Sequence, residues 1–201
     1  MFKNIIFDFG QVLVRFDPDF MTAAYVSDEK ERQLISKIVF DRKYWDRLDE
    51  GNICDDEVIK GICSSLPTHL HEKAILVYTN WIYNIPNIDG MLEILQTLKN
   101  KGVKLYLLSN ISTTFAQNYT KSKNVAELLS YFDGLTFSGP IKLTKPNREI
   151  FEYLLSTHGL SASDCLFIDD NEKNIEGCKS VGITGYLFDG NAKKLREYLS
   201  I

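Results

Sequence analysis

The sequence predicts an α/β fold in which a parallel sheet carries an inserted helical subdomain. Short apolar runs recur along the 201 residues, and each ends in a polar cluster. Segments with helical spacing separate the later runs, and the gap between the first two runs is far longer than one crossover needs. Strands that alternate with helices form right-handed crossovers, so these observations together indicate a parallel sheet with one insertion.

Five apolar runs have the length and the boundaries of strands that are buried on both faces. They cover residues 5–7, 103–108, 135–137, 166–168 and 183–188. They end at Asp8, Ser109-Asn110, Ser138-Gly139, Asp169-Asp170 and Asp189-Gly190. A parallel sheet presents its ligand site at the carboxyl ends of its strands, so we expect these polar ends to converge.

Two segments between the predicted strands have the spacing of crossover helices. The first stops at Gly102 and contains Met91, Ile94, Leu95 and Leu98. The second stops near Gly159 and contains Ile150, Phe151, Leu154 and Leu155. A glycine just past the last apolar residue is a common helix end, which supports both helices.

The segment from residue 16 to residue 85 is predicted to be a helical insertion. It has helical patterns at residues 34–39 and 58–62 and little strand character. Pro86 disfavours helix in the residue before it, and so marks the return to the sheet-forming part.

Composition indicates a globular protein with a small-molecule partner. The chain is 44% hydrophobic and 25% charged, in the ordinary globular range. Its 23 Lys and Arg against 27 Asp and Glu give a net charge of −4, without the basic surface that binds nucleic acid.

The cysteines and the apolar runs indicate a cytoplasmic location. Four cysteines without a CxxC pair suggest free thiols in a reducing compartment. The apolar run near the N-terminus is too short for the core of a signal peptide, and no stretch reaches the length of a membrane span.

Four motifs resemble, in order, those of the haloacid dehalogenase-like hydrolase superfamily. They are IIFDFGQV, LYLLSN, Lys145-Pro146 within KLTKPNREIF, and FIDDNEKN. The resemblance implies a magnesium-dependent phosphatase with a Rossmann-like core at residues 1–15 and 86–201 and a helical cap at 16–85. DFGQV and FIDDNEKNIEGC look most like the branch that includes bacterial sugar-phosphate phosphatases, among them α-glucose-1-phosphate phosphatases.

Asp8 is the expected nucleophile. Its carboxylate follows a strand directly and can attack phosphorus to form an aspartyl-phosphate, which divides one difficult step into two easier ones. An isolated aspartate here would more often cap a turn, but the four ordered motifs favour catalysis.

Asp169 and Asp170 are expected to hold Mg²⁺ together with Asp8. Adjacent carboxylates near a third repel unless a cation or shared protons relieve them, and Mg²⁺ favours carboxylates, waters and phosphate oxygens. The sequence leaves open which of the two binds directly, because Asp170 can also cap the helix expected at about 172–179. Asn174 is a candidate to support this site by hydrogen bonding.

Ser109, Asn110 and Lys145 are expected to bind the phosphoryl group. Ser109 and Asn110 can hold its oxygens beside a helix that starts near Thr113, although a simple helix cap predicts the same letters. Lys145 can offset the charge of the transferred group, and Pro146 suits the first position of a helix. Lys142 is the alternative lysine, and the Lys-Pro motif favours Lys145.

Gly10 departs from the pattern of the resembling phosphatases, which carry there a second aspartate that protonates the leaving alcohol. General acid catalysis is typically worth about 10²–10⁴-fold. Three interpretations remain: a leaving group that needs little help, an acid from Asp17, Asp19 or the cap, or a module that binds without turnover. The Gly10 carbonyl can still bind the metal.

The sequence therefore predicts an Mg²⁺-dependent phosphatase of a small phosphorylated metabolite, such as glucose 1-phosphate. One alternative is a 2-haloacid dehalogenase, which also lacks the second aspartate but does not need adjacent carboxylates for a metal. The other is a non-catalytic module that binds a phosphorylated metabolite.

Overall fold

The computed structural model describes residues 2–201, which form a five-stranded parallel sheet in the order β3-β2-β1-β4-β5. The prediction of an α/β fold with a parallel sheet is confirmed. The strands are β1 (Asn4–Phe7), β2 (Lys104–Ser109), β3 (Gly134–Phe137), β4 (Cys165–Asp169) and β5 (Thr184–Leu187). Each lies within one residue of the apolar run that predicted it.

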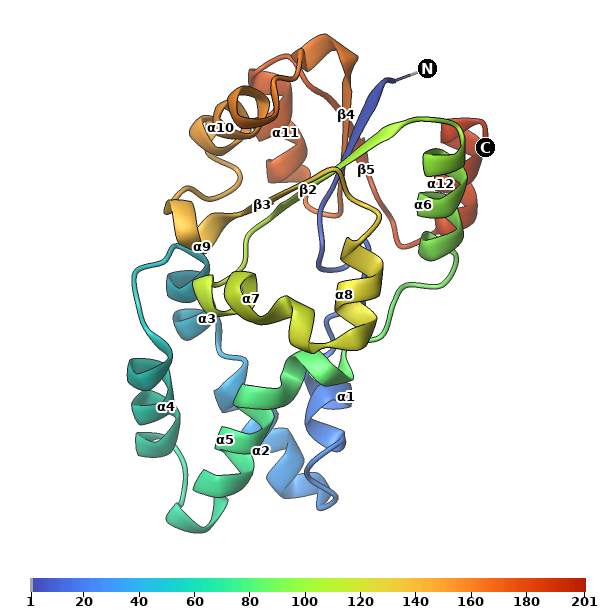
Figure 1. Ribbon diagram of the computed structural model, residues 1–201. Helices are drawn as coiled ribbons and strands as arrows, with labels where there is room; N and C mark the ends of the chain where they lie inside the picture. The colour runs from blue at the N-terminus through green and yellow to red at the C-terminus, as the bar shows by residue number, and fades with distance from the viewer. Residues whose placement is uncertain (1) are drawn as a thin grey trace.

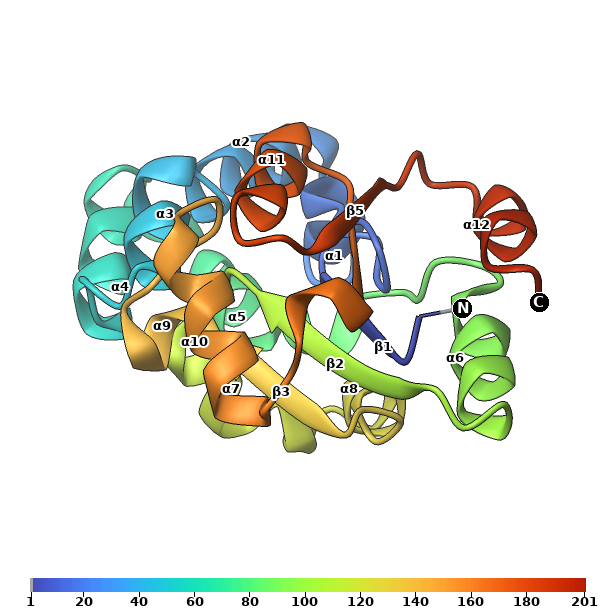
Figure 2. The ribbon, with the colours of Figure 1, turned by 90° about the horizontal axis from the view of Figure 1, so that it is seen from above.

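Helices cover both faces of the sheet (Figures 1 and 2). On one face, side chains such as Phe7 and Leu107 pack against α6 (Met91–Asn100), α8 (Lys123–Leu129) and α12 (Ala192–Leu199). On the other, Ile6 and Phe167 pack against α10 (Arg148–His158) and α11 (Glu172–Ser180). Successive residues of a strand point to opposite faces, so each strand contributes to both cores.

The helical insertion, residues 16–85, lies beyond the carboxyl ends of the strands (Figure 1). Its elements are α1 (Pro18–Ala23), α2 (Glu29–Val39), α3 (Arg42–Asp49), α4 (Asp55–Ser64), η1 (Thr68–Leu70), α5 (His71–Asn80) and η2 (Trp81–Asn84). It has its own apolar cluster, in which Ile35, Val58 and Val77 are fully buried. None of the helices in residues 2–201 combines the length and apolar character needed to cross a bilayer.

The insertion contacts the sheet-forming part through α3, α4 and η2, which meet helix α8 and the short helices α7 (Thr113–Asn118) and α9 (Ser138–Ile141). The Ser138 hydroxyl donates a hydrogen bond of 2.6 Å to the Asp49 carbonyl. The Thr114 hydroxyl donates to the Asp55 carboxylate. The remaining short elements are η3 (Tyr119–Lys121) and η4 (Ala162–Asp164).

Candidate active site

Three carboxylates meet where β1 and β4 end. The Asp8 amide donates to the Ile168 carbonyl over 2.9 Å, which aligns Asp8 with the end of the neighbouring strand. One oxygen from each of Asp8, Asp169 and Asp170 lies within 4.8 Å of the other two. Asp8 is 9% exposed and Asp169 is fully buried, whereas Asp170 is exposed. Parallel pairing of β1 with β4 thus brings together residues about 160 positions apart.

Lys145 is buried between two of these carboxylates. Its ammonium lies 2.8 Å from Asp8 Oδ1 and 2.7 Å from Asp169 Oδ2. Burial by itself would lower the pKa of Lys145, but Asp8 and Asp169 outweigh burial and raise it, so the ammonium stays charged. One ammonium cannot neutralise three carboxylates, and the cluster retains an excess of negative charge.

That excess perturbs the acids. Burial, with a contribution from Asp169, raises the pKa of Asp8 to about 7 against the lowering by Lys145. Burial and Asp169 also raise the pKa of Asp170. Both carboxyls would be relieved by a cation, because an opposite charge nearby favours the ionised form.

Hydrogen bonds hold the acids in place. Asn174 Nδ2 donates to both oxygens of Asp169 over 3.0 and 3.1 Å, and the Asn171 amide donates to Asp169 over 2.8 Å. The Phe9 amide donates to Asp8 Oδ1 over 2.7 Å. The carboxylates are therefore oriented before any ligand binds, which is how outer hydrogen bonds fix the geometry of a metal site.

Asn110 fixes the backbone of Lys145. Its side-chain amide donates to the Lys145 carbonyl over 2.9 Å and accepts from the Lys145 amide over 2.8 Å. The side chain of Asn110 is thus engaged with the protein, and the residue also lines the site. Ser109 ends β2 at 2% exposure and lines the same space.

The prediction that Pro146 occupies the first position of a helix was wrong. Helix α10 begins at Arg148 after its cap Asn147, so Pro146 precedes the helix. Asn147 instead donates to the Thr144 carbonyl over 3.0 Å, closing a turn that contains Lys145 and Pro146. The turn directs Lys145 inward, while Lys142 is exposed.

Two cavities adjoin this cluster. The polar cavity, about 390 Å³, is lined by Asp8, Gly10, Arg42, Asp49, Ser109, Asn110, Lys145, Pro146, Asp170, Asn171, Lys173 and Asn174. The aromatic cavity, about 270 Å³, is lined by Phe9, Gly10, Gln11, Phe16, Phe40, Arg42, Trp45, Asp49, Trp81, Ser109, Asn110 and Ile111. Gly10, Arg42, Asp49, Ser109 and Asn110 line both, so the cavities are neighbouring parts of one site.

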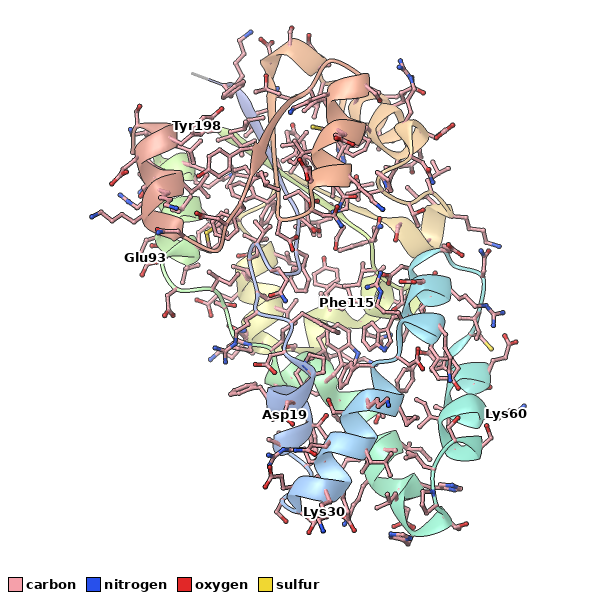
Figure 3. All side chains as sticks on the ribbon, turned by 180° about the vertical axis from the view of Figure 1, so that it is seen from behind. Asp19, Lys30, Lys60, Glu93, Phe115 and Tyr198 are labelled. Carbon is pink, nitrogen blue, oxygen red and sulfur yellow. The ribbon has the colours of Figure 1, made fainter. Side chains whose placement is uncertain are left out.

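The aromatic cavity forms where the insertion meets the sheet-forming part. Trp45 and Trp81 of the insertion lie 5.2 Å apart between ring centroids, and Trp81 stacks on Phe115 at 5.7 Å. Figure 3 shows Phe115 between the two parts of the chain. Phe115 also packs on Phe9, next to Asp8, at 5.2 Å.

The acids considered as replacements at position 10 lie elsewhere. Asp17 caps α1 by accepting from the Phe20 amide, and Asp19, on α1 (Figure 3), pairs with Arg32 at 3.1 Å. Neither lines a cavity that contains Asp8.

Arg42 and Asp49 were missed by sequence reasoning. They lie seven residues apart on α3, two helical turns, so both face the same way as Trp45 between them. That spacing of one basic, one aromatic and one acidic residue was the available signal. This spacing indicates a site only once it is known which face of α3 meets the sheet edge.

The residues fit a hard divalent cation. Asp8, Asp169 and Asp170 supply only oxygens, their charge is not balanced by Lys145, and Gly10 adds a backbone carbonyl beside them. Oxygen ligands with room for water and phosphate are the preference of Mg²⁺.

Comparison with known proteins gives one consistent family. The model of the haloacid dehalogenase-like hydrolases matches residues 2–182. A D-ribitol-5-phosphate phosphatase of Bacteroides thetaiotaomicron is 29% identical over 211 residues, covering 98% of this chain and 97% of that protein. A sesquiterpene phosphatase of Aspergillus oryzae is 26% identical, covering 92% of this chain and 88% of that protein.

Solved structures share the fold. A HAD family enzyme from Bacteroides thetaiotaomicron, in complex with magnesium and inorganic phosphate, aligns with a TM-score of 0.67 at 20% identity, covering 95% of this chain and 96% of that one. An L-2-haloacid dehalogenase from Xanthobacter autotrophicus aligns with a TM-score of 0.68 at 17% identity, covering 100% of this chain and 83% of that one.

Proposed function

Because the chain belongs to the haloacid dehalogenase-like hydrolase family, as its motifs indicated, we propose that it is an Mg²⁺-dependent phosphatase of a small phosphorylated metabolite. The observation that carries the proposal is the buried contact of Lys145 with Asp8 and Asp169, with Asp170 beside them. A structural ion pair would need one carboxylate. The surplus acids, facing a polar cavity, support a site for a cation and a phosphate.

In this proposal Asp8 is the nucleophile. Its free carboxylate oxygen attacks phosphorus, the bond from phosphorus to the leaving oxygen breaks, and an aspartyl-phosphate forms on Asp8. Water then hydrolyses this intermediate, and Asp8 is regenerated. Lys145 orients Asp8 and offsets negative charge on the phosphoryl group.

Ser109 and Asn110 bind the phosphoryl group in this proposal. Ser109 offers a hydroxyl and Asn110 a main-chain amide at the end of β2. Asp8, Asp169, Asp170 and the Gly10 carbonyl would hold the Mg²⁺, which when bound supplies charge stabilisation for the phosphate oxygens.

The leaving group belongs in the aromatic cavity. At about 270 Å³ this cavity is smaller than the roughly 300–1,000 Å³ of sites for drug-sized ligands, so it suits a small alcohol. Aromatic rings beside one arginine and one aspartate can stack on a sugar ring and bind its hydroxyls. We propose a sugar phosphate such as glucose 1-phosphate, and the similarity to a D-ribitol-5-phosphate phosphatase supports this class.

The helical insertion is proposed to act as the cap. Its hydrogen bonds to α7 and α9, and the presence of Arg42 and Asp49 in the lining of the polar cavity, support a role in excluding water during the reaction. We also propose a cytoplasmic location, since all four cysteines are free thiols.

The test is phosphate release from sugar phosphates, polyol phosphates and 4-nitrophenyl phosphate, with and without Mg²⁺. Asp8→Asn should lower kcat by at least about 10³-fold because the amide cannot attack phosphorus. Asp164→Asn, a partly exposed acid on the opposite end of the sheet, is the matched control and should keep full activity. Turnover that survives Asp8→Asn or a chelator would refute the proposal.

The same panel decides the alternatives. The fold is shared with an L-2-haloacid dehalogenase, so halide release from a short 2-haloacid without metal is the assay for that reaction. Thermal stabilisation by the phosphorylated compounds without any turnover would instead indicate a binding module.

A further inference from the structure

We propose that Asp49, from helix α3 of the insertion, is the general acid and base of this enzyme. It takes the role that a second aspartate has in the resembling phosphatases, at the position where this chain has Gly10. The inference rests on the proposed phosphatase activity and adds a catalytic residue to it. Three observations support it: the set of acids that border the polar cavity, the lack of a bonding partner for the Asp49 carboxyl among residues 2–201, and the side of the phosphorus from which the insertion approaches.

Few groups that border the polar cavity can exchange a proton. Its lining contains three carboxyls, those of Asp8, Asp49 and Asp170. Asp8 is the nucleophile, and Asp170 lies in the acidic cluster with Asp8 and Asp169. Asp49 is the carboxyl that remains.

The side chain of Asp49 has no competing partner. Its main-chain carbonyl accepts from Ser138, which fixes the end of α3 against α9. No hydrogen bond or ion pair among residues 2–201 involves its carboxyl group, and it is half-buried at the junction of the polar and aromatic cavities. A group in this position is available to a ligand that fills both.

The direction of the reaction favours a donor from the insertion. In phosphoryl transfer the attacking and leaving oxygens lie roughly in line through phosphorus, so the leaving oxygen faces away from Asp8. Asp8 projects from the carboxyl end of the sheet, and the insertion covers that end (Figure 1). Lys173, another proton-bearing group of the lining, belongs to α11 of the sheet-forming part.

The surroundings of Asp49 allow it to hold a proton at neutral pH. Burial raises the pKa of its carboxyl to about 7. Arg42 and Lys145 lower the pKa, whereas Asp46 and Asp8 raise it. An acid with a pKa near the working pH is the most effective proton donor and acceptor.

The protons balance over one cycle. As Asp8 bonds to phosphorus and the phosphorus–oxygen bond to the leaving group breaks, the proton of Asp49 passes to the leaving oxygen and an alcohol departs. In the second step the Asp49 carboxylate takes a proton from the attacking water. The bond from phosphorus to Asp8 breaks, inorganic phosphate forms, and Asp49 is again protonated.

Asp49→Asn tests this sequence by leaving-group dependence. With the best sugar or polyol phosphate, kcat/KM should fall by about 10²–10⁴-fold. With 4-nitrophenyl phosphate, whose leaving group needs no proton, the first turnover should stay within a few-fold of the wild type. Later turnovers should be slow, because the water that hydrolyses the aspartyl-phosphate then lacks its base. Phosphorylated Asp8 should therefore accumulate and be visible in intact-protein mass spectra.

The matched control is Glu50→Gln, an exposed acid next to Asp49. It should keep wild-type kinetics with both substrates. Equal losses of Asp49→Asn on both substrates in the first turnover, or no loss on either, would overturn the assignment of Asp49. If the wild type itself shows no turnover that depends on Asp8, the proposed function fails instead.

A rescue variant separates proton transfer from structural damage. An added Cβ at Gly10 meets nothing within 4 Å, and Gly10 lines both cavities, so an aspartate fits there. The double variant Gly10→Asp/Asp49→Asn should have a kcat/KM for the sugar phosphate at least about tenfold higher than that of Asp49→Asn alone. Failure of Gly10→Asp to raise activity in that background, when Gly10→Asp alone is active, would contradict a shared role.

Discussion

At the scale of single residues, the candidate site is a cluster of buried charges. Lys145 is 4% exposed and contacts Asp8 and Asp169, which are themselves buried. Desolvating such groups costs several kcal/mol per ion, and their attraction repays this only with good geometry and additional hydrogen bonds. Asn174 and two main-chain amides supply those bonds. The proposed cation and phosphate site accounts for so costly a cluster.

Lys145→Ala is expected to destabilise the protein and abolish turnover. Without the ammonium, Asp8 and Asp169 are buried acids with no positive partner, and removing one member of a buried pair costs about 3–5 kcal/mol. Urea unfolding in a chelator measures the loss. Lys142→Ala, three residues away and exposed, should change the free energy of unfolding by less than about 0.5 kcal/mol. Equal effects would show that the buried contacts do not matter.

Asp133 provides a test of electrostatics away from the site. It pairs with Lys99 at 2.8 Å and Lys104 at 3.0 Å and accepts from the Leu105 amide. Partial burial would raise its pKa, but these partners lower the pKa to about 2. A carboxyl whose pKa is lowered by folding stabilises the folded state at pH values above its unfolded-state pKa, which is near 3.8. This stabilisation is lost as the pH falls towards 2.

Asp133→Asn should therefore lower the free energy of unfolding by about 1–2 kcal/mol at pH 7, after allowance for solvent screening. The difference from the wild type should shrink between pH 4 and pH 2. Urea unfolding across this range measures it. A difference that is constant with pH would assign the effect of the substitution to packing rather than charge.

At the scale of elements, the position of α3 decides whether the site is complete. Helix α3 carries Arg42 and Asp49, and its end is followed by Gly51, which has φ of +67°. A Cβ on Gly51 would lie 2.3 Å from the Gly139 carbonyl oxygen of α9. The two backbones approach so closely that only glycine fits, and this contact fixes the insertion relative to the sheet edge.

Gly51→Ala is predicted to lower both stability and activity. The substitution adds a backbone clash to the strain of a positive φ, and it displaces α3 and with it Asp49. Gly102→Ala is the matched control, because Gly102 has φ of +76° but open space around its Cβ. It should cost about 1–2 kcal/mol from strain alone and leave kcat unchanged.

Gly51→Ala should lower the free energy of unfolding by more than Gly102→Ala does. It should also lower kcat/KM for the best phosphorylated substrate. Thermal unfolding and steady-state kinetics on the two variants give the comparison. If both variants lose the same stability and keep full activity, the approach of α3 to α9 does not position the site.

At the scale of the whole molecule, the site lies where two separately packed parts meet. The sheet-forming part contributes Asp8, Lys145 and the acidic pair Asp169 and Asp170, and the insertion contributes Arg42, Asp49 and most of the aromatic lining. In the proposed reaction, the sheet-forming part holds the phosphate and the insertion contacts the leaving group. Substrate preference is expected to follow changes in the insertion.

The sequence by itself determined the strands, the parallel sheet and the convergence of Asp8 with Asp169 and Asp170. These follow from local rules, since apolar runs define the strands and parallel pairing aligns their ends. Lys145 was also found from sequence, through the motif around it.

Only the tertiary structure decided what Asn110, Pro146 and Asp49 do. Asn110 bonds to the backbone of Lys145, 35 residues away, and Pro146 lies in a turn before α10. Asp49 becomes a catalytic candidate because α3 packs against α9, almost 90 residues further along the chain. Such contacts depend on how two packed surfaces meet, and no local pattern of residues encodes that meeting.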